Sequence, residues 1–173
     1  MDNFREGLTR IKAFVFDIDG VLSLQTIPLN TSGIPSRTVN LRDGYALQLA
    51  VKKGYKVAII SGSNSRDYLK RLKMLGIKDI YLNSRSKLRH YNHFREKYGL
   101  ENSEILFMGD DIPDYQVMKM AGVPACPSDA DSEIKHVAMY ISDRAGGAGC
   151  VRDVIEQVLR LHNNWMDSDA FAW

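Results

Sequence analysis

Short apolar runs alternate with amphipathic stretches along the whole sequence, and this alternation limits the folds that are open to the chain. The runs are three or four residues long, nearly all apolar, and bounded by Gly, Asp or Ser. Strands that are buried on both faces of a parallel sheet have this length and composition. The runs that we expect to form strands are 13–16, 57–60, 80–82, 105–108, 123–126 and 139–141.

The stretches between the runs are about ten residues long and fit helices. Glycine ends most of them, and a capping residue or a proline begins several. Strands and helices that alternate in this way predict a three-layer α/β/α sandwich around a central, mostly parallel sheet, with right-handed crossovers. The expected helices span roughly 43–53, capped by Asp43, then 65–75, 87–98, 113–122 and a last helix from about residue 150.

Residues 21–42 interrupt the alternation. They contain two short extended segments, around 24–29 and 37–41, joined by the turn sequence Asn30-Thr31-Ser32-Gly33. This pattern predicts a β-hairpin flap inserted directly after the first strand. A segment of about 22 residues is too small for a cap domain with a core of its own.

Length and composition favour one domain. The chain has 173 residues, of which 45% are hydrophobic and 25% charged, which suits a soluble protein with a single core. We expect one domain over residues 1–162, flap included, followed by a C-terminal tail over 163–173. The tail contains Trp165, Phe171 and Trp173, and aromatic residues favour docking onto the domain over a frayed end.

Charge and targeting signals exclude several classes of partner. The chain has 23 Lys and Arg against 21 Asp and Glu, a net charge of +2, which is too balanced to favour nucleic acid or an anionic membrane. We find no signal peptide at the start and no apolar stretch long enough to span a bilayer. Two cysteines, Cys126 and Cys150, cannot form a disulfide scaffold. We therefore expect a cytoplasmic protein.

The polar residues that follow the runs predict a site at one edge of the sheet. Ligands of parallel α/β sheets bind at the carboxyl ends of the strands. The residues at those ends include five carboxylates, a lysine at a helix start, and a serine followed by glycine. They are Asp17 and Asp19 after the first run, Ser61 and Gly62 after the second, Lys87 after the third, and Asp110, Asp111 and Asp114 after the fourth.

Five carboxylates at one edge require a positive charge. Two like charges about 4 Å apart repel each other by ~4 kcal/mol at an effective dielectric constant of about 20. Without a cation, the carboxylates would raise their own pKa values or spread apart. A hard divalent ion with oxygen ligands removes this conflict, and Mg²⁺ is the usual ion beside phosphate. The sequence therefore predicts a magnesium site.

The order and spacing of these residues resemble the four motifs of the haloacid dehalogenase superfamily of phosphohydrolases. The motifs are the Asp-x-Asp-Gly after the first run, the serine, the lysine, and the Gly-Asp-Asp-x-x-Asp after the fourth run. The small size, the flap, the sequence Arg42-Asp43-Gly44-Tyr45 and the glycine-rich stretch 146–152 resemble its capless subgroup, which contains the 3-deoxy-D-manno-octulosonate 8-phosphate phosphatases. The resemblance covers roughly residues 12–161.

The resemblance implies a two-step reaction at Asp17. Asp17 would attack phosphorus and become an aspartyl phosphate. Asp19 would protonate the departing alkoxide and then activate the water that hydrolyses the intermediate. Lys87 would neutralise charge on the transferring group. Mg²⁺ would be bound by Asp17, by the backbone carbonyl of Asp19 and by Asp110.

Further residues would bind the substrate or support the metal site. Ser61 and Gly62, at the start of a helix, would bind phosphate oxygens. Arg42 would hold the carboxylate of the substrate. Asp111 and Asp114 would order metal-bound water or the lysine from behind the metal ligands. Taken singly, each of these residues also fits a structural role as a turn, a helix cap or a surface charge.

The subgroup implies a phosphorylated keto sugar acid as substrate. The expected reaction is hydrolysis of 3-deoxy-D-manno-octulosonate 8-phosphate to the free sugar acid and phosphate, in lipopolysaccharide precursor synthesis. Ser63 and Ala148 depart from the pattern of the octulosonate phosphatases, and Ser63 also departs from the Glu that is typical of phosphatases of nine-carbon keto-sugar phosphates. Neither pattern is met, so a nine-carbon keto-sugar-acid 9-phosphate of the sialic acid type stays open as the alternative substrate. The subgroup also implies a homotetramer in which the flap or tail of a neighbour covers the site.

Two other classes of protein stay open. A phospho-receiver domain also phosphorylates an aspartate on a parallel α/β fold, but it does not place a nucleophile and an acid together after the first strand. A noncatalytic binding module could keep the fold, although all four motifs are intact here. Steady phosphate release, rather than a long-lived phosphorylated form, would distinguish the enzyme from the receiver.

Overall fold

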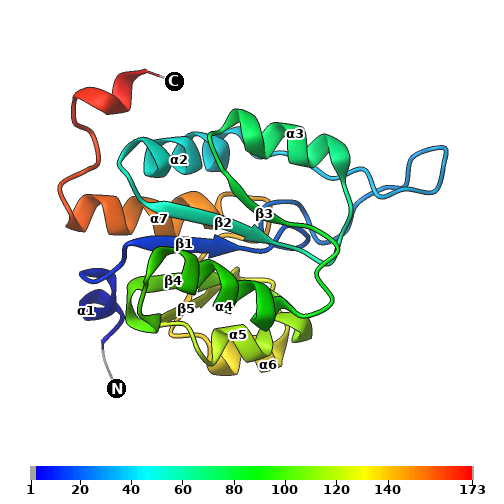
Figure 1. Cartoon of the computed structure of the whole chain (residues 1–173). Coiled ribbons are helices and arrows are strands. Elements are labelled where there is room, and N and C mark those ends of the chain that lie inside the picture. The colour runs from blue at the N-terminus through cyan, green and yellow to red at the C-terminus, as the bar shows by residue number, and fades with distance from the viewer. Residues whose placement is uncertain (1–2, 173) are drawn as a thin grey trace.

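Six parallel strands form the central sheet of the structure, a computed structural model that describes residues 3–172 (Figure 1). The strand order is β3-β2-β1-β4-β5-β6, and every neighbouring pair is parallel. Each strand coincides with an expected apolar run to within about one residue at either end. The strands are β1 (Ala13–Phe16), β2 (Lys56–Ile60), β3 (Asp79–Tyr81), β4 (Ile105–Met108), β5 (Val123–Cys126) and β6 (Tyr140–Ile141).

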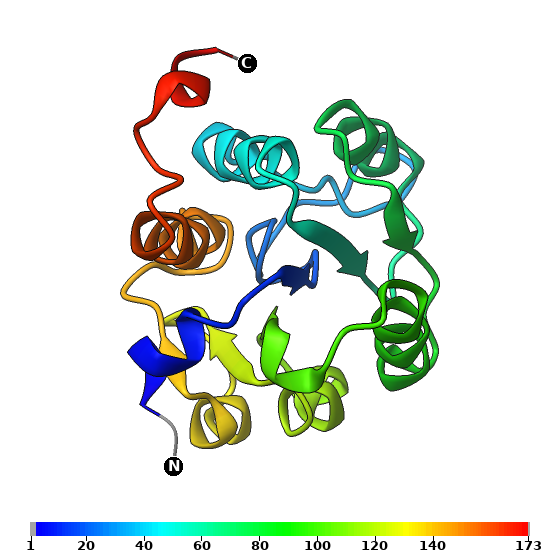
Figure 2. The same ribbon diagram turned by 60° about the vertical axis from the view of Figure 1, so that its left-hand side comes forward.

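Helices cover both faces of the sheet, so the expected three-layer sandwich is confirmed (Figure 2). One face carries α1 (Phe4–Leu8), α2 (Leu41–Lys52), α3 (Arg66–Met74) and α7 (Cys150–Leu161), and the other carries α4 (Lys87–Tyr98), α5 (Tyr115–Met118) and α6 (Ser132–Val137). A hydrophobic core lies on each face of the sheet. Strand β1 contributes to both by alternation, because Phe14 and Phe16 pack in the core under α2 and α7, whereas Val15 packs in the core under α4 and α5. Among residues 3–172, no helix has the length and apolar character needed to cross a bilayer.

The N-cap of helix α2 lies three residues before the expected one, because Asn40 rather than Asp43 caps the helix. The Asn40 Oδ1 atom accepts hydrogen bonds from the backbone N–H groups of Arg42 (2.9 Å) and Asp43 (3.2 Å). Asp43 lies inside the helix, is buried, and accepts a hydrogen bond from the N–H of Arg152 at 2.7 Å. Arg152 is in the first turn of α7, so Asp43 caps a different helix from the one expected.

The stretch after β4 is less helical than its sequence suggests. A 3₁₀ helix, η2 (Ile112–Asp114), comes first, and α5 (Tyr115–Met118) follows it directly. Two short helices therefore replace the single helix expected over 113–122. Asp111 and Asp114 form a capping box around η2. Both carboxylates are thereby fixed close to the end of β4.

The segment between β1 and α2 forms a narrow loop that projects from the domain (Figure 1). A flap is therefore present where one was expected, but its described residues form one isolated antiparallel bridge, Leu29 to Pro35, instead of two regular strands. A two-stranded hairpin on its own is only marginally stable in water. The tip exposes apolar side chains, with Leu29 64% and Ile34 54% exposed.

The C-terminal tail docks on α2. The Tyr45 ring meets Trp165 edge-on, with 6.0 Å between the ring centroids, and the Tyr45 hydroxyl donates to the carbonyl of Ala170 at 2.6 Å. Lys53 forms ion pairs with two aspartates of the tail. Trp173 lies outside the described residues. The tail occupies the end of the domain opposite the carboxyl ends of the strands, so it does not approach the acidic residues of its own chain (Figure 1).

Candidate active site

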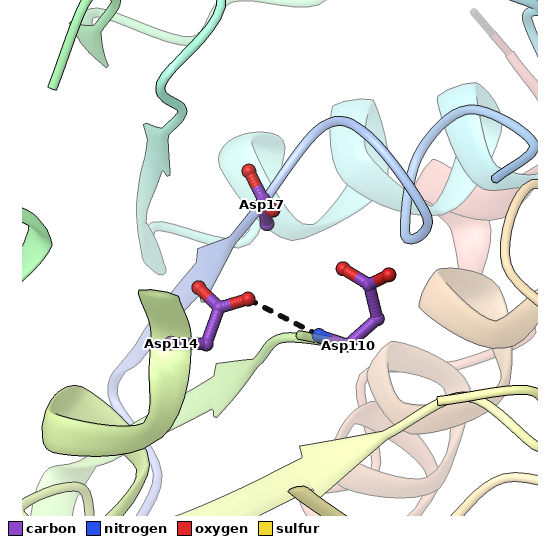
Figure 3. Close-up of side chains that lie close together, drawn as sticks. All are labelled: Asp17, Asp110 and Asp114. Carbon is purple, nitrogen blue, oxygen red and sulfur yellow. Dashed lines mark hydrogen bonds between the residues drawn. The ribbon is translucent and has the colours of Figure 1, made fainter. Parts of the chain in front are cut away.

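Three aspartates meet at the carboxyl ends of two neighbouring strands (Figure 3). Asp17 follows β1, Asp110 follows β4 after one glycine, and Asp114 ends η2. The last residues of β1 and β4 are paired in register, so the two strands end at the same level of the sheet. One carboxylate oxygen from each aspartate lies within 4.8 Å of the others, and all three residues are buried. We call these three residues the acidic cluster.

Lys87 is the cation in direct contact with the acidic cluster. Its Nζ atom lies 2.8 Å from Asp17 Oδ2 and 2.6 Å from Asp114 Oδ1, and the residue is 8% exposed. Ser86 caps α4 and makes Lys87 its first residue, as expected. Burial alone would lower the pKa of Lys87, but the two carboxylates outweigh burial and raise the pKa above its usual value. The lysine therefore stays charged.

The carboxyl groups of the acidic cluster have raised pKa values. Burial is the largest cause for each of them. Repulsion from neighbouring aspartates adds to it, so that the pKa of Asp17 is about 7 and that of Asp110 about 8. The pKa of Asp114 is also raised, although its contact with Lys87 opposes the shift. Fully ionised, the acidic cluster would hold more negative charge than one lysine neutralises, and the raised pKa values show that the carboxyl groups keep protons instead.

The hydrogen-bond partners of each carboxylate show where a cation fits. Asp114 is used by the chain itself, because Oδ1 contacts Lys87 and Oδ2 accepts the N–H of Asp110 at 3.2 Å. Asp110 Oδ1, in contrast, is buried without a hydrogen-bond partner among the described residues. Gly20 leaves room for this side chain, since a Cβ there would lie 1.9 Å from Asp110 Oδ2. An orphaned carboxylate oxygen beside Asp17 fits a hard cation such as Mg²⁺.

Asp19 lies outside the acidic cluster, in a more exposed position. Its side chain is 42% exposed and accepts two hydrogen bonds from Arg37, from Nε to Oδ1 at 2.7 Å and from Nη2 to Oδ2 at 2.9 Å. Arg37 and Asp19 line the same cavity of about 630 Å³ as Asp17 and Asp110. Arg37 was not among the expected site residues, because no motif spacing links position 37 to position 19.

Ser61 and Gly62 line this cavity, but they do not lie at a helix start. Helix α3 begins at Arg66 and is capped by Ser65, so a loop separates it from the expected phosphate-binding residues. Ser61 is buried, and its carbonyl oxygen accepts the N–H of Ser84 at 2.9 Å. This hydrogen bond connects the loop after β2 to the loop before α4, the helix that begins with Lys87.

Two more residues of interest line this cavity, Asp111 and Arg85, whereas Arg42 does not. Asp111 lines it and accepts the N–H of Ile112 at 2.8 Å, which is a capping contact of η2. Arg85, in the loop before α4, is an exposed cation of the same cavity. Arg42 is exposed and lines a separate cavity between α2 and α7. Within one chain, therefore, the structure does not bring Arg42 to the acidic cluster.

Comparisons with known proteins identify relatives that share this fold. A family model described as haloacid dehalogenase-like hydrolase matches residues 37–122. The 3-deoxy-D-manno-octulosonate 8-phosphate phosphatase of Salmonella typhi is 32% identical over 149 residues, which cover 86% of this chain and 79% of the relative. The sequence similarity thus extends well beyond the residues of the motifs.

Solved structures of similar proteins superpose closely on this chain. A crystal structure of 3-deoxy-D-manno-octulosonate 8-phosphate phosphatase from Yersinia pestis matches with a TM-score of 0.90 at 28% identity and covers 94% of this chain and 88% of that one. The phosphatase of this name from Moraxella catarrhalis, in complex with a magnesium ion, a phosphate ion and a KDO molecule, matches with a TM-score of 0.89 at 33% identity and covers 97% of this chain and 95% of that one.

Proposed function

We propose that this chain, which belongs to the haloacid dehalogenase-like hydrolases, hydrolyses 3-deoxy-D-manno-octulosonate 8-phosphate. Its similarity to the phosphatases of that compound shows that it is a phosphoric monoester hydrolase. Hydrolysis would release the free sugar acid and phosphate for lipopolysaccharide precursor synthesis. The observation that carries the proposal is the contact of Lys87 with Asp17 beside the orphaned oxygen of Asp110.

We propose Mg²⁺ as the cofactor. Asp17, Asp110 and the backbone carbonyl of Asp19 would hold it, and the excess negative charge of the acidic cluster supports this assignment. When bound, the ion would offset the repulsion between the carboxylates and a phosphate dianion. Asp114 and Asp111 would support the metal site without binding the ion. Asp114 would hold Lys87 in place, and Asp111 would fix η2.

Asp17 is the proposed nucleophile. Its Oδ1 atom accepts the N–H of Ile18 at 2.7 Å and its Oδ2 atom contacts Lys87, so the carboxylate has a fixed orientation. In the first step, an Asp17 oxygen forms a bond to phosphorus while the bond from phosphorus to the ester oxygen breaks. Lys87, Ser61 and Gly62 would bind the phosphoryl oxygens during this transfer.

Asp19 is the proposed acid and base. In the first step it would give a proton to the departing ester oxygen. In the second step it would take a proton from the water that attacks phosphorus, which breaks the bond to Asp17 and frees phosphate. The partly exposed position of its carboxylate in the cavity supports both roles, because the leaving group departs toward solvent and the attacking water enters from solvent.

Arginines around the site would recognise the carboxylate of the sugar acid. We propose Arg85 for this role, because it lines the cavity and no ion pair ties it to another residue in the range 3–172. Arg42 could take part only across a subunit boundary, at the site of a neighbouring copy. The projecting flap with its exposed Leu29 and Ile34 supports an assembly, which we propose to be a homotetramer, in which one flap covers the next site.

A phosphate-release screen tests the proposed function. The chain is assayed with 3-deoxy-D-manno-octulosonate 8-phosphate, a nine-carbon keto-sugar-acid 9-phosphate and a neutral sugar phosphate, each with Mg²⁺ or EDTA. We expect steady release that EDTA abolishes and the highest kcat/KM for the eight-carbon acid. A higher kcat/KM for the nine-carbon acid would show that the nine-carbon compound is the substrate instead. Undiminished turnover in EDTA would refute the proposed requirement for Mg²⁺.

A further inference from the structure

The ion pair between Asp19 and Arg37 joins the flap to the site. Two guanidinium nitrogens each contact one carboxylate oxygen, at 2.7 and 2.9 Å. A two-point contact of this kind fixes both the direction and the plane of the carboxylate. The Arg37 side chain is 10% exposed, whereas that of Asp19 is 42% exposed. A nearly buried cation therefore holds a carboxylate that would otherwise be free to rotate in solvent.

Hydrogen bonds at the base of the flap fix the position of Arg37. The Ser23 Oγ atom, fully buried, accepts the N–H of Thr38 at 2.9 Å, and the Thr38 Oγ1 atom accepts the N–H of Leu24 at 2.9 Å. Ser23 is also bridged to Asp19 through the backbone. The two ends of the flap are thus tied together beside the residues that form the ion pair.

We propose that Arg37 is a positioning residue for Asp19, which acts on the reaction only by holding that carboxylate toward the leaving group and the water. The proposal rests on the role of Asp19 proposed above. Lys87 does not supply this function, because its ammonium group is occupied by Asp17 and Asp114. The flap would then contribute to catalysis within its own chain, independently of any neighbour that it covers.

A displaced Asp19 would affect the two steps to different extents for different esters. Nitrophenolate leaves phosphorus without a proton, so p-nitrophenyl phosphate would still phosphorylate Asp17 quickly. The second step requires a base for every ester, because the attacking water must lose a proton. Phosphorylated Asp17 would therefore accumulate, and a burst of nitrophenolate would precede slow turnover. A sugar phosphate, whose alkoxide requires a proton, would be slowed in both steps without a burst.

A double-mutant cycle on the ion pair tests the proposal. Arg37→Ala, Asp19→Asn and the double variant are assayed in Mg²⁺ for kcat with the sugar-acid phosphate and for burst amplitude with p-nitrophenyl phosphate. We expect Arg37→Ala to lower kcat about 10- to 100-fold and to show a burst. The double variant should be no slower than Asp19→Asn alone, because Arg37 then has nothing left to position. Losses that multiply would overturn the proposal, since Arg37 would then contact the substrate directly.

Further variants separate positioning from folding. Arg37→Lys, which keeps the charge, should recover part of kcat, and Thr38→Val, which keeps Arg37 but removes a hydroxyl at the flap base, should show a weaker burst. Arg160→Ala is the matched control, because it removes an exposed pair with Glu156 (2.6 Å) on α7, outside the cavity, and should change neither readout.

The outcomes distinguish this proposal from the one on which it rests. Wild-type kinetics in Arg37→Ala, together with a slow Asp19→Asn, would overturn the positioning role alone. Wild-type kinetics in Asp19→Asn would instead overturn the proposed acid and base role. Circular dichroism of each variant confirms that the fold is intact before its kinetics are compared.

Discussion

The substitution Asp110→Asn should stabilise the metal-free protein while it removes phosphatase activity. Asp110 carries a buried oxygen without a hydrogen-bond partner among the described residues, and it lies beside Asp17 and Asp114. Asparagine keeps the shape of the side chain, removes its charge and offers an N–H donor to a neighbouring carboxylate. Activity should be lost because a proposed metal ligand is replaced.

The raised pKa of Asp110 sets the size of the effect. Burial and its neighbours raise this pKa from 3.8 to about 8. In the unfolded chain this carboxyl group has its ordinary pKa, about three units below pH 7, and is therefore ionised, whereas in the folded state it must keep its proton. At 1.36 kcal/mol per pH unit, this difference lowers the free energy of unfolding at pH 7 by up to about 4 kcal/mol. Because neighbouring groups relax and water enters, we expect a gain of about 1–3 kcal/mol, or about 2–10 °C in Tm for a chain of this size.

The pH dependence of this gain has a definite sign. The folded pKa lies above the unfolded one, so the folded state binds more protons between about pH 4 and pH 8. The metal-free wild type should therefore lose stability as the pH rises through this window, and Asp110→Asn should lose less. Asp17, with a pKa of about 7, accounts for part of the slope that remains.

Urea unfolding in EDTA at pH 5 and pH 7.5 measures the effect. The gain from Asp110→Asn should be larger at pH 7.5, and Mg²⁺ should stabilise the wild type but not the variant. Asp67→Asn is the matched control, because Asp67 is 97% exposed and should change stability by less than about 0.5 kcal/mol. An Asp110→Asn protein that is less stable than the wild type in EDTA at pH 7.5 would refute the reasoning.

Three other substitutions test the site and its support. Asp17→Asn should abolish phosphate release without loss of Tm, and retained turnover would exclude Asp17 as the nucleophile. Lys87→Met should abolish activity and, in urea unfolding, cost about 3 kcal/mol, because Asp17 and Asp114 lose their buried partner; an unchanged midpoint would contradict this. Gly146→Ala should lower both Tm and kcat, because its Cβ would lie 1.9 Å from the carbonyl oxygen of Gly20, in the loop that follows the proposed nucleophile. A wild-type Tm would show that this backbone contact is not tight.

The sheet and the acids at its edge could be predicted because both depend on local sequence. A buried parallel strand is a short apolar run wherever it occurs in the chain, and a residue that directly follows it must lie at the carboxyl end of the sheet. Asp17 and Asp110 therefore meet as expected, since β1 and β4 are neighbours that end level with each other. The lysine at the start of α4 follows from the same rule.

Asp43 shows where local sequence is insufficient. Asn40 and Asp43 are both good helix caps and both precede an apolar stretch, so propensity alone does not choose between them. The choice is made by α7, whose first turn begins after Gly149, a residue without a side chain to cap it. Asp43 supplies the missing acceptor from α2, a contact between residues that lie more than a hundred positions apart in the sequence.

Arg37 was missed for the same reason, and its contact depends on how the flap closes. The pair with Asp19 lies where Ser23 and Thr38 bring the two ends of the flap together, and no periodicity in the sequence indicates that contact. The acidic cluster, in contrast, depends mainly on the sheet, because Asp17 and Asp110 follow β1 and β4, which are each held by strands on both sides. Asp114 is fixed beside them by the capping box of η2, and the three carboxylates stay together against their own repulsion. The proposed cation site is therefore set mainly by the rigid sheet, whereas the position of Asp19, the proposed acid and base, depends on a loop. Sequence motifs indicate the first far better than the second.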